Sequence, residues 1–271
     1  MSFKIGFTAE NNEDSLQEEV YTASHQTAAP RKSVVQVYFE GRNTTLTYYN
    51  DQFDLHCGDT VFVDGKLEGM RGRVEKVSYN FKIKLSDYKR VIAVADTTVN
   101  GQFFNAGSHF LTFDRNAIPG SKVITWFRAP VKEEDEFVSS SDDTSFLLEK
   151  PESMDISPVI AERGEEYFIM GKVRYISIDG IKGYAIVEGG DGYEVEFEYR
   201  NGEICHLVCS CFCSYNCKHK FAAMLQLKES LDFINKHYRD EYERTGYFAA
   251  INRMTLFRFA FDGKETSSFV L

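Results

Sequence analysis

Five of the six cysteines in this chain of 271 residues lie between Cys205 and Cys217, and His219 follows closely. Thiolates and imidazoles are ligands that zinc prefers, and a structural zinc site takes four of them in a tetrahedron. In a reducing compartment, clustered cysteines more often hold a metal or do redox chemistry than form structural disulfides. The cluster therefore predicts a metal site, with Zn²⁺ as the ion.

The spacing within the cluster indicates which side chains hold the ion. Cys209 and Cys211 leave the end of an expected strand two residues apart, so both sulfurs project from the same face. Cys217 and His219 repeat this spacing after a loop of five residues, and His219 begins a helical pattern. We expect these four side chains to bind the zinc and to tie the strand to the helix.

Cys213 offers an alternative to Cys209 as the first ligand, with a loop of only three residues before Cys217. We favour Cys209 because it ends a hydrophobic strand and because the longer loop leaves more room for a tetrahedron. Cys205 and His206 are assigned to the strand itself. Strict alternation from Cys209 would place Cys205 on the same face and His206 on the opposite one.

The arrangement Cys209-Ser-Cys211, five residues, Cys217-Lys-His219 resembles the SWIM zinc finger, whose pattern is Cys-x-Cys-x(n)-Cys-x-His. The following Lys-Phe-Ala-Ala-Met-Leu is similar to the small-residue helix of that family, and the resemblance covers about residues 168–232. It implies a ββα zinc module associated with DNA binding and with protein–protein interaction. As partners, it implies nucleic acid, DNA rather than RNA, or another protein.

A β-meander and a long helix are expected to position the ligands. Alternation and turn residues predict strands at Tyr167–Ile178, Tyr184–Glu188, Tyr193–Tyr199 and Glu203–Cys209. Within Tyr193–Tyr199 the aromatic and aliphatic side chains share one face and the glutamates the other, so one face is buried and the other is acidic. From Lys218 a helical period runs to Gly246, and Leu256–Phe261 and Phe269–Leu271 again look like strands.

The N-terminal half is rich in short β-branched and aromatic runs separated by turn residues. They predict strands at Val34–Phe39, Thr45–Tyr49, Thr60–Val63, Gly72–Val77, Phe81–Leu85 and Val91–Ala95. This spacing is typical of a small antiparallel barrel. Within it, residues 58–77 resemble the Gly-Asp-x-Val-x-Val signature of SH3-like barrels that carry KOW motifs. Later aromatic residues, from Phe103 to Phe127, are expected in the core.

These patterns together predict an α+β protein of two folded domains. We expect a disordered acidic arm at 1–33, a β-rich, barrel-like domain at 34–130, an acidic linker at 131–166 and the zinc domain at 167–271. The linker assignment rests on its acidic and serine-rich runs and on its prolines, Pro151 and Pro158.

The net charge of −10 is unevenly distributed. Residues 25–130 carry 14 Lys and Arg against 10 Asp and Glu, whereas residues 131–166 carry 3 against 12. The folded N-terminal part is thus mildly basic and able to meet phosphates. Candidate nucleic-acid contacts are Lys218 and Lys220 beside the metal, together with Arg71, Arg73, Lys76, Lys82, Lys84, Lys89 and Arg90.

No apolar run of signal-peptide or membrane-spanning length occurs, so we expect a cytoplasmic protein without a membrane partner. The chain lacks the GxxxxGK[ST], GxSxG, HExxH and HxE…PCxxC patterns, and a zinc with four protein ligands has no open position for water. We therefore expect a non-enzymatic interaction module with no small-molecule substrate. The alternatives are a zinc switch regulated by thiol oxidation, with Cys213 as the spare thiol, or a purely structural zinc with a protein partner.

Overall fold

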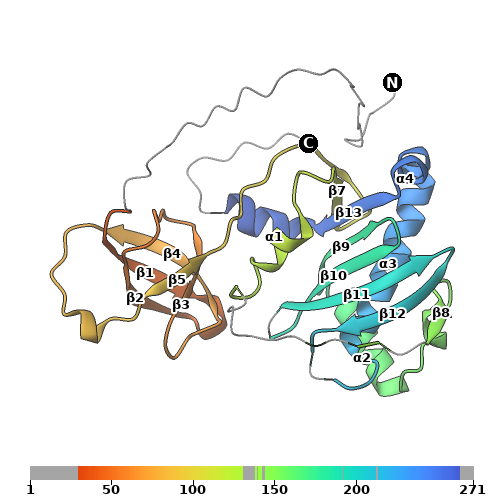
Figure 1. Cartoon of the computed structure of the whole chain (residues 1–271), viewed down its shortest axis with the longest axis horizontal. Coiled ribbons are helices and arrows are strands. Elements are labelled where there is room, and N and C mark those ends of the chain that lie inside the picture. Colours follow the sequence, from red (N-terminus) through yellow and green to blue (C-terminus); the bar gives the residue numbers. More distant parts are fainter. Residues whose placement is uncertain are drawn as a thin grey trace. The chain divides into compact units, whose positions relative to one another are not determined.

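The computed structural model describes residues 30–130, 138, 140–141, 144–190, 192–211 and 213–262, and Figure 1 shows their arrangement. The chain divides between Val94 and Ala95 into two compact units. The protein is mixed α and β, with one antiparallel sheet in each unit and the helices in the second. The predicted arm lies almost wholly outside the described residues.

The first unit is a five-stranded sheet in the order β2-β1-β4-β3-β5. Its strands are β1 (Ser33–Phe39), β2 (Thr44–Asn50), β3 (Thr60–Val63), β4 (Arg71–Ser78) and β5 (Val91–Val94), with short 3₁₀ turns at Glu40–Arg42 and Leu85–Asp87. Buried side chains from β1, β3 and β4 form its core, including Val35, Val37 and Val61. Gly72 on β4 is required there, because an added Cβ would overlap with Cγ1 of Val37.

This sheet is open, so an SH3-like barrel is not confirmed. A single isolated bridge between Tyr49 and Arg90 links the region of β2 to that of β5. The strand expected at Phe81–Leu85 is wrong, because this segment pairs with no strand. Its lysines are exposed, and the chain turns at Leu85 instead of continuing in an extended form.

The second unit is built on an eight-stranded sheet in the order β6-β7-β13-β9-β10-β11-β12-β8. Its strands are β6 (Phe103–Asn105), β7 (Phe110–Phe113), β8 (Ser145–Leu147), β9 (Val173–Asp179), β10 (Lys182–Glu188), β11 (Gly192–Arg200), β12 (Glu203–Cys209) and β13 (Tyr247–Asn252). The meander β9 to β12 follows the prediction closely, except that the first strand begins at Val173 and not at Tyr167.

Five α-helices accompany this sheet in the described part of the chain. They are α1 (Gly120–Ile124), α2 (Pro158–Ile169), α3 (Lys218–His237), α4 (Arg239–Thr245) and α5 (Arg253–Leu256), with a 3₁₀ turn at Pro151–Ser153 and a π-helical turn at Phe257–Phe261. The helical period from Lys218 is thus confirmed as two helices, and the second ends at Gly246 with the positive φ of 61° that glycine accepts easily.

Residues 103–113, which the strand pattern grouped with the N-terminal domain, pair with the second sheet. Strand β7 lies beside β13, and β13 lies between β7 and β9. The domain expected at 34–130 is therefore cut short at Val94, because the partner strand for β7 comes from the far end of the chain. As expected, Phe103, Phe113 and Trp126 are buried core residues.

The segment expected to be an acidic linker contributes structure to the second unit. Its last part forms α2, with Ser157 before the helix and Pro158 in the first turn, where a missing N–H costs nothing. Residues 145–147 form the edge strand β8, paired with β12. Residues 131–137, 139 and 142–143 lie outside the described residues.

Helix α3 covers one face of the sheet, crossing the meander in Figure 1, and α2 packs against α3. Apolar side chains of α3, such as Ala223 and Leu227, pack there against Val195 and Ile176. The glutamates of β11 lie on the opposite face, as the alternation predicted. Trp126 and Phe259 are also buried, with their rings 5.4 Å apart.

The strand expected at Leu256–Phe261 is wrong, because these residues are helical. The Asn252 side chain accepts hydrogen bonds from the backbone N–H groups of Met254 and Thr255, which starts the helix. The strand expected at Phe269–Leu271 lies outside the described residues.

Candidate metal centre

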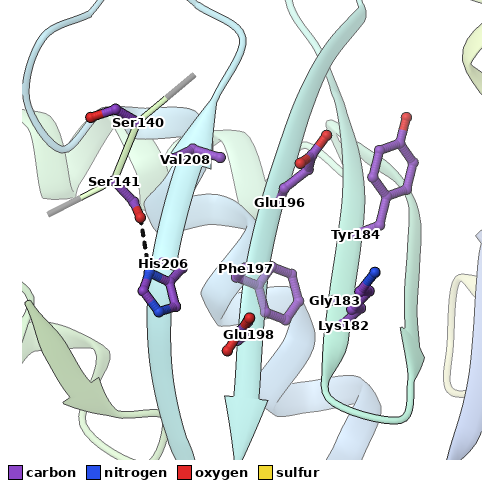
Figure 2. Close-up of a pocket in the computed structure, with 10 residues that line it drawn as sticks. All are labelled: Ser140, Ser141, Lys182, Gly183, Tyr184, Glu196, Phe197, Glu198, His206 and Val208. Carbon is purple, nitrogen blue, oxygen red and sulfur yellow. Dashed lines mark hydrogen bonds between the residues drawn. The ribbon is translucent and has the colours of Figure 1, made fainter. Parts of the chain in front are cut away.

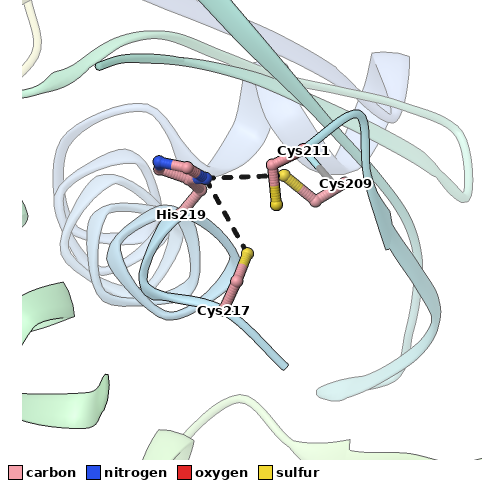
Figure 3. A group of neighbouring side chains, drawn as sticks. All are labelled: Cys209, Cys211, Cys217 and His219. Atoms are coloured by element: carbon pink, nitrogen blue, oxygen red, sulfur yellow. Dashed lines mark hydrogen bonds between the residues drawn. The ribbon is translucent and has the colours of Figure 1, made fainter. Parts of the chain in front are cut away.

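The end of β12 and the start of α3 bring three cysteines and one histidine together (Figure 3). Cys209 is the last residue of β12, and Cys211 follows in the turn. Cys217 immediately precedes α3, and His219 lies in its first turn. The four ligand atoms all lie within 4.8 Å of one another, so these residues can hold a metal ion.

The distances fit a tetrahedral zinc. His219 Nδ1 lies 3.8 Å from Cys209 Sγ and 3.9 Å from Cys217 Sγ. With Zn–S of about 2.3 Å and Zn–N of about 2.0 Å, a tetrahedron places sulfur and nitrogen about 3.5 Å apart. All three cysteines are free thiols. The donor set and its spacing therefore suit zinc with only small movements.

Burial disfavours the charged, thiolate form of the cysteines at this site. Cys217 and His219 are buried, and Cys209 and Cys211 are half-buried. A hydrogen bond from the Cys209 thiol lowers the pKa of Cys217, and the same contact raises the pKa of Cys209. Burial raises the pKa of Cys211 to about 11. One thiolate therefore forms easily, and a cation is needed to stabilise the other two.

Aromatic rings fix the orientation of the His219 imidazole. The Tyr193 ring stacks on it with centroids 4.2 Å apart and 16° between the planes, and the Tyr167 ring lies at 5.6 Å. Nε2 of His219 is buried and has no hydrogen-bond partner among the described residues. Stacking on Tyr193 thus orients the His219 ring without a hydrogen bond at Nε2.

Two lysines flank the centre and both contact neighbouring side chains. The Lys218 ammonium lies 4.5 Å from the centroid of the Tyr167 ring on α2, and Lys220 Nζ lies 3.4 Å from Asn216 Oδ1. These contacts place both lysines beside the first turn of α3, next to Cys217 and His219.

The geometry groups Cys209, and not Cys213, with the other three ligands. Cys213 is exposed, as is Cys57 in the first unit.

The expectation that Cys205 shares the face of Cys209 is wrong. A β-bulge shifts the register between β11 and β12, so Glu196 pairs with Val208 but Glu198 pairs with Cys205. One extra residue in β12 reverses the alternation, and Cys205 comes to lie on the glutamate face.

The remaining basic candidates all belong to the first unit. Arg73 and Lys76 are exposed on β4, Arg71 is half-buried there, and Lys82 and Lys84 are exposed in the segment that follows. Lys84 forms an ion pair of 3.9 Å with Asp87. Of the other two, Arg90 donates to Asp51 and Lys89 is exposed.

No protein-family model, curated protein or solved structure matches this chain. Among the described helices, none combines the length and the apolar character needed to cross a membrane.

Proposed function

We propose that Cys209, Cys211, Cys217 and His219 bind one structural zinc that fastens the meander to α3. The convergence of four donors within 4.8 Å carries this proposal. The ion would neutralise thiolates that burial otherwise disfavours, and it would add a direct link between the end of β12 and the start of α3. The sequence pattern supports the more specific proposal that these residues belong to a SWIM-type module.

Metal content tests the zinc. Purified protein is expected to hold one tightly bound zinc, and Cys217→Ser or His219→Ala is expected to lose it, because each removes a buried ligand. The matched control is Cys213→Ser, which changes an exposed thiol outside the group and should keep the zinc. A zinc that survives Cys217→Ser, or one lost in Cys213→Ser, would refute this ligand set.

We further propose that the protein is a non-enzymatic nucleic-acid-binding module whose contact surface lies on the first unit, with DNA as the ligand. Support comes from the outward side chains of β4, where Arg73 and Lys76 are exposed, and from Lys82 beyond it. On β11 of the second unit, Glu194 and Glu198 are paired with arginines and Glu196 is exposed, so this face is less suited to phosphates than the outward side chains of β4.

Fluorescence anisotropy with duplex and single-stranded DNA and with RNA, at two salt concentrations, tests this role. Replacing Lys76 and Lys82 by glutamine should weaken binding and reduce the salt slope by about two, one for each lost phosphate contact. The control replaces Lys150 and Lys236, two exposed lysines of the second unit, in the same way.

Equal losses in both double variants would show that only net charge matters. No binding at low salt by zinc-loaded protein would refute the nucleic-acid role, and the zinc module would then serve a protein partner. Tighter binding to RNA than to DNA would overturn the choice of DNA.

A further inference from the structure

A second group of metal-ligand side chains lies on the opposite face of the same strand. The ligand atoms of Glu198, Cys205 and His206 lie within 4.8 Å of one another. Glu198 and Cys205 pair directly across β11 and β12, and His206 is the next residue along. A carboxylate, a thiol and an imidazole together form a ligand set suited to borderline divalent transition metals.

The β-bulge is what creates this group. It turns Cys205 to the face of Glu198, and it places His206 at a φ of 52°. Glycine and asparagine accept this left-handed conformation most easily, and other residues adopt it only at a cost in free energy. Side chains held in such conformations concentrate at functional sites, and bulges commonly redirect side chains there.

The group borders a solvent-open cavity of about 560 Å³ on the glutamate face, shown in Figure 2. Ser141 Oγ lies 2.9 Å from His206 Nδ1, and in Figure 2 the other ring nitrogen points away from Ser141. With Nδ1 donating to Ser141, Nε2 keeps its lone pair for a metal ion. A hydrogen bond of this kind is the usual means of orienting a metal-bound histidine.

The charged side chains around Glu198, Cys205 and His206 permit a cation to bind, but only weakly. Arg200 donates to Oε2 of Glu198 at 2.7 Å, which fixes the carboxylate and leaves Oε1 available. Lys182 lies opposite Glu198 on β10, and Glu196 lines the same cavity with its carboxylate exposed. Two nearby positive charges lower the affinity for a cation, so a metal here would exchange more readily than one held by the four buried ligands.

We propose that Glu198, Cys205 and His206 form a second, exchangeable site for a divalent transition metal such as Zn²⁺ or Co²⁺. Three protein ligands leave a fourth position open toward the cavity, in contrast to the closed set formed by Cys209 and its partners. This proposal does not depend on the first site, because the two groups share no residue and lie on opposite faces of the sheet.

Metal titration of the full chain tests the second site. Protein holding its tight zinc is titrated with Co²⁺, and bound metal is counted by mass spectrometry while the visible absorption of thiolate-bound Co²⁺ is recorded. The wild type should take up one additional Co²⁺ per chain. Cys205→Ser and His206→Asn should each lose this uptake, or weaken it by at least ten-fold, and should keep the tight zinc.

The choice of His206→Asn protects the test against misfolding, because asparagine accepts a positive φ. Two exposed thiols provide the controls, and Cys57→Ser and Cys213→Ser should both keep the second metal. Failure of the wild type to bind a second ion would overturn the proposal. So would undiminished uptake by the Cys205 and His206 variants, and so would loss of the uptake in either control.

Discussion

At the scale of single residues, His219 holds its position in an unusual way. Its Nδ1 faces two sulfurs while its Nε2 is buried without a hydrogen-bond partner among the described residues. The flat face of Tyr193 therefore restricts the rotation of the ring. An imidazole held in place before the metal arrives loses less conformational entropy on binding.

Removing this stacking should weaken the metal centre. We expect Tyr193→Leu to lower zinc affinity by about ten-fold, as changes to residues that orient metal ligands commonly do. Competition with a chromophoric chelator measures the change. Tyr193→Phe keeps the ring and should bind zinc as the wild type does; equal weakening in both variants would show that the hydroxyl, and not stacking, matters.

The gathering of Cys209, Cys211, Cys217 and His219 could be predicted from sequence, because cysteine and histidine are chemically distinctive and their spacing limits which atoms meet. The second group could not. Its assembly depends on the bulge that brings Cys205 opposite Glu198, and no residue of β12 signals an inserted position. Glycine is the usual mark of such a bulge, and here His206 takes its place.

At the scale of elements, the packing of α2 against α3 determines where the first turn of α3 lies. Gly164 of α2 permits this contact, because an added Cβ would lie 2.8 Å from Phe221 Cδ1, 2.9 Å from Phe221 Cβ and 3.1 Å from the Lys218 carbonyl oxygen. Backbone and Cβ atoms cannot rotate away as the end of a side chain can. The two helices would have to separate.

We therefore expect Gly164→Ala to destabilise the second unit by about 1–2 kcal/mol. Overpacking costs about 1–3 kcal/mol, and the higher helix propensity of alanine returns up to about 1 kcal/mol. Denaturant unfolding measures the difference, and zinc affinity should fall with it. The control is Gly190→Ala, where an added Cβ meets nothing within 4 Å. A stabilised Gly164→Ala variant would contradict this account.

The elements that were predicted well have strong local patterns, such as β11 and α3. Helix α2 was missed although Ser157 and Pro158 are a typical helix start, because the acidic and serine-rich surroundings suggested a linker. Phe257, Phe259 and Phe261 alternate like a strand, yet the cap from Asn252 starts a helix that continues through them. Strand β13 carries no alternation because both of its faces are buried.

At the scale of the whole molecule, two units with separate cores should unfold separately, and both proposed metal sites belong to the second. Removing the metal with a chelator should therefore lower the midpoint temperature of the second unit's unfolding transition and leave that of the first unit unchanged. We assume that the metal adds about 4 kcal/mol to the free energy of unfolding, which is less than the order of 10 kcal/mol found for zinc-finger peptides. Losing this contribution would lower the midpoint temperature by about 8–16 °C. Calorimetry with and without chelator measures this. If chelation shifted both transitions, or neither, the two units would not unfold separately with metal bound only to the second.

The position of β13 also sets an order of events during synthesis. Strands β9 to β12 and α3 are neighbours in sequence as well as in space, so they can associate as soon as they are made. Strands β6 and β7 emerge early but reach the sheet only through β13, whose residues are translated more than a hundred positions later. Until then the apolar strand Phe110–Phe113 can pair with β6 but lacks its other neighbour, β13. It is the segment of the nascent chain for which a chaperone would matter most.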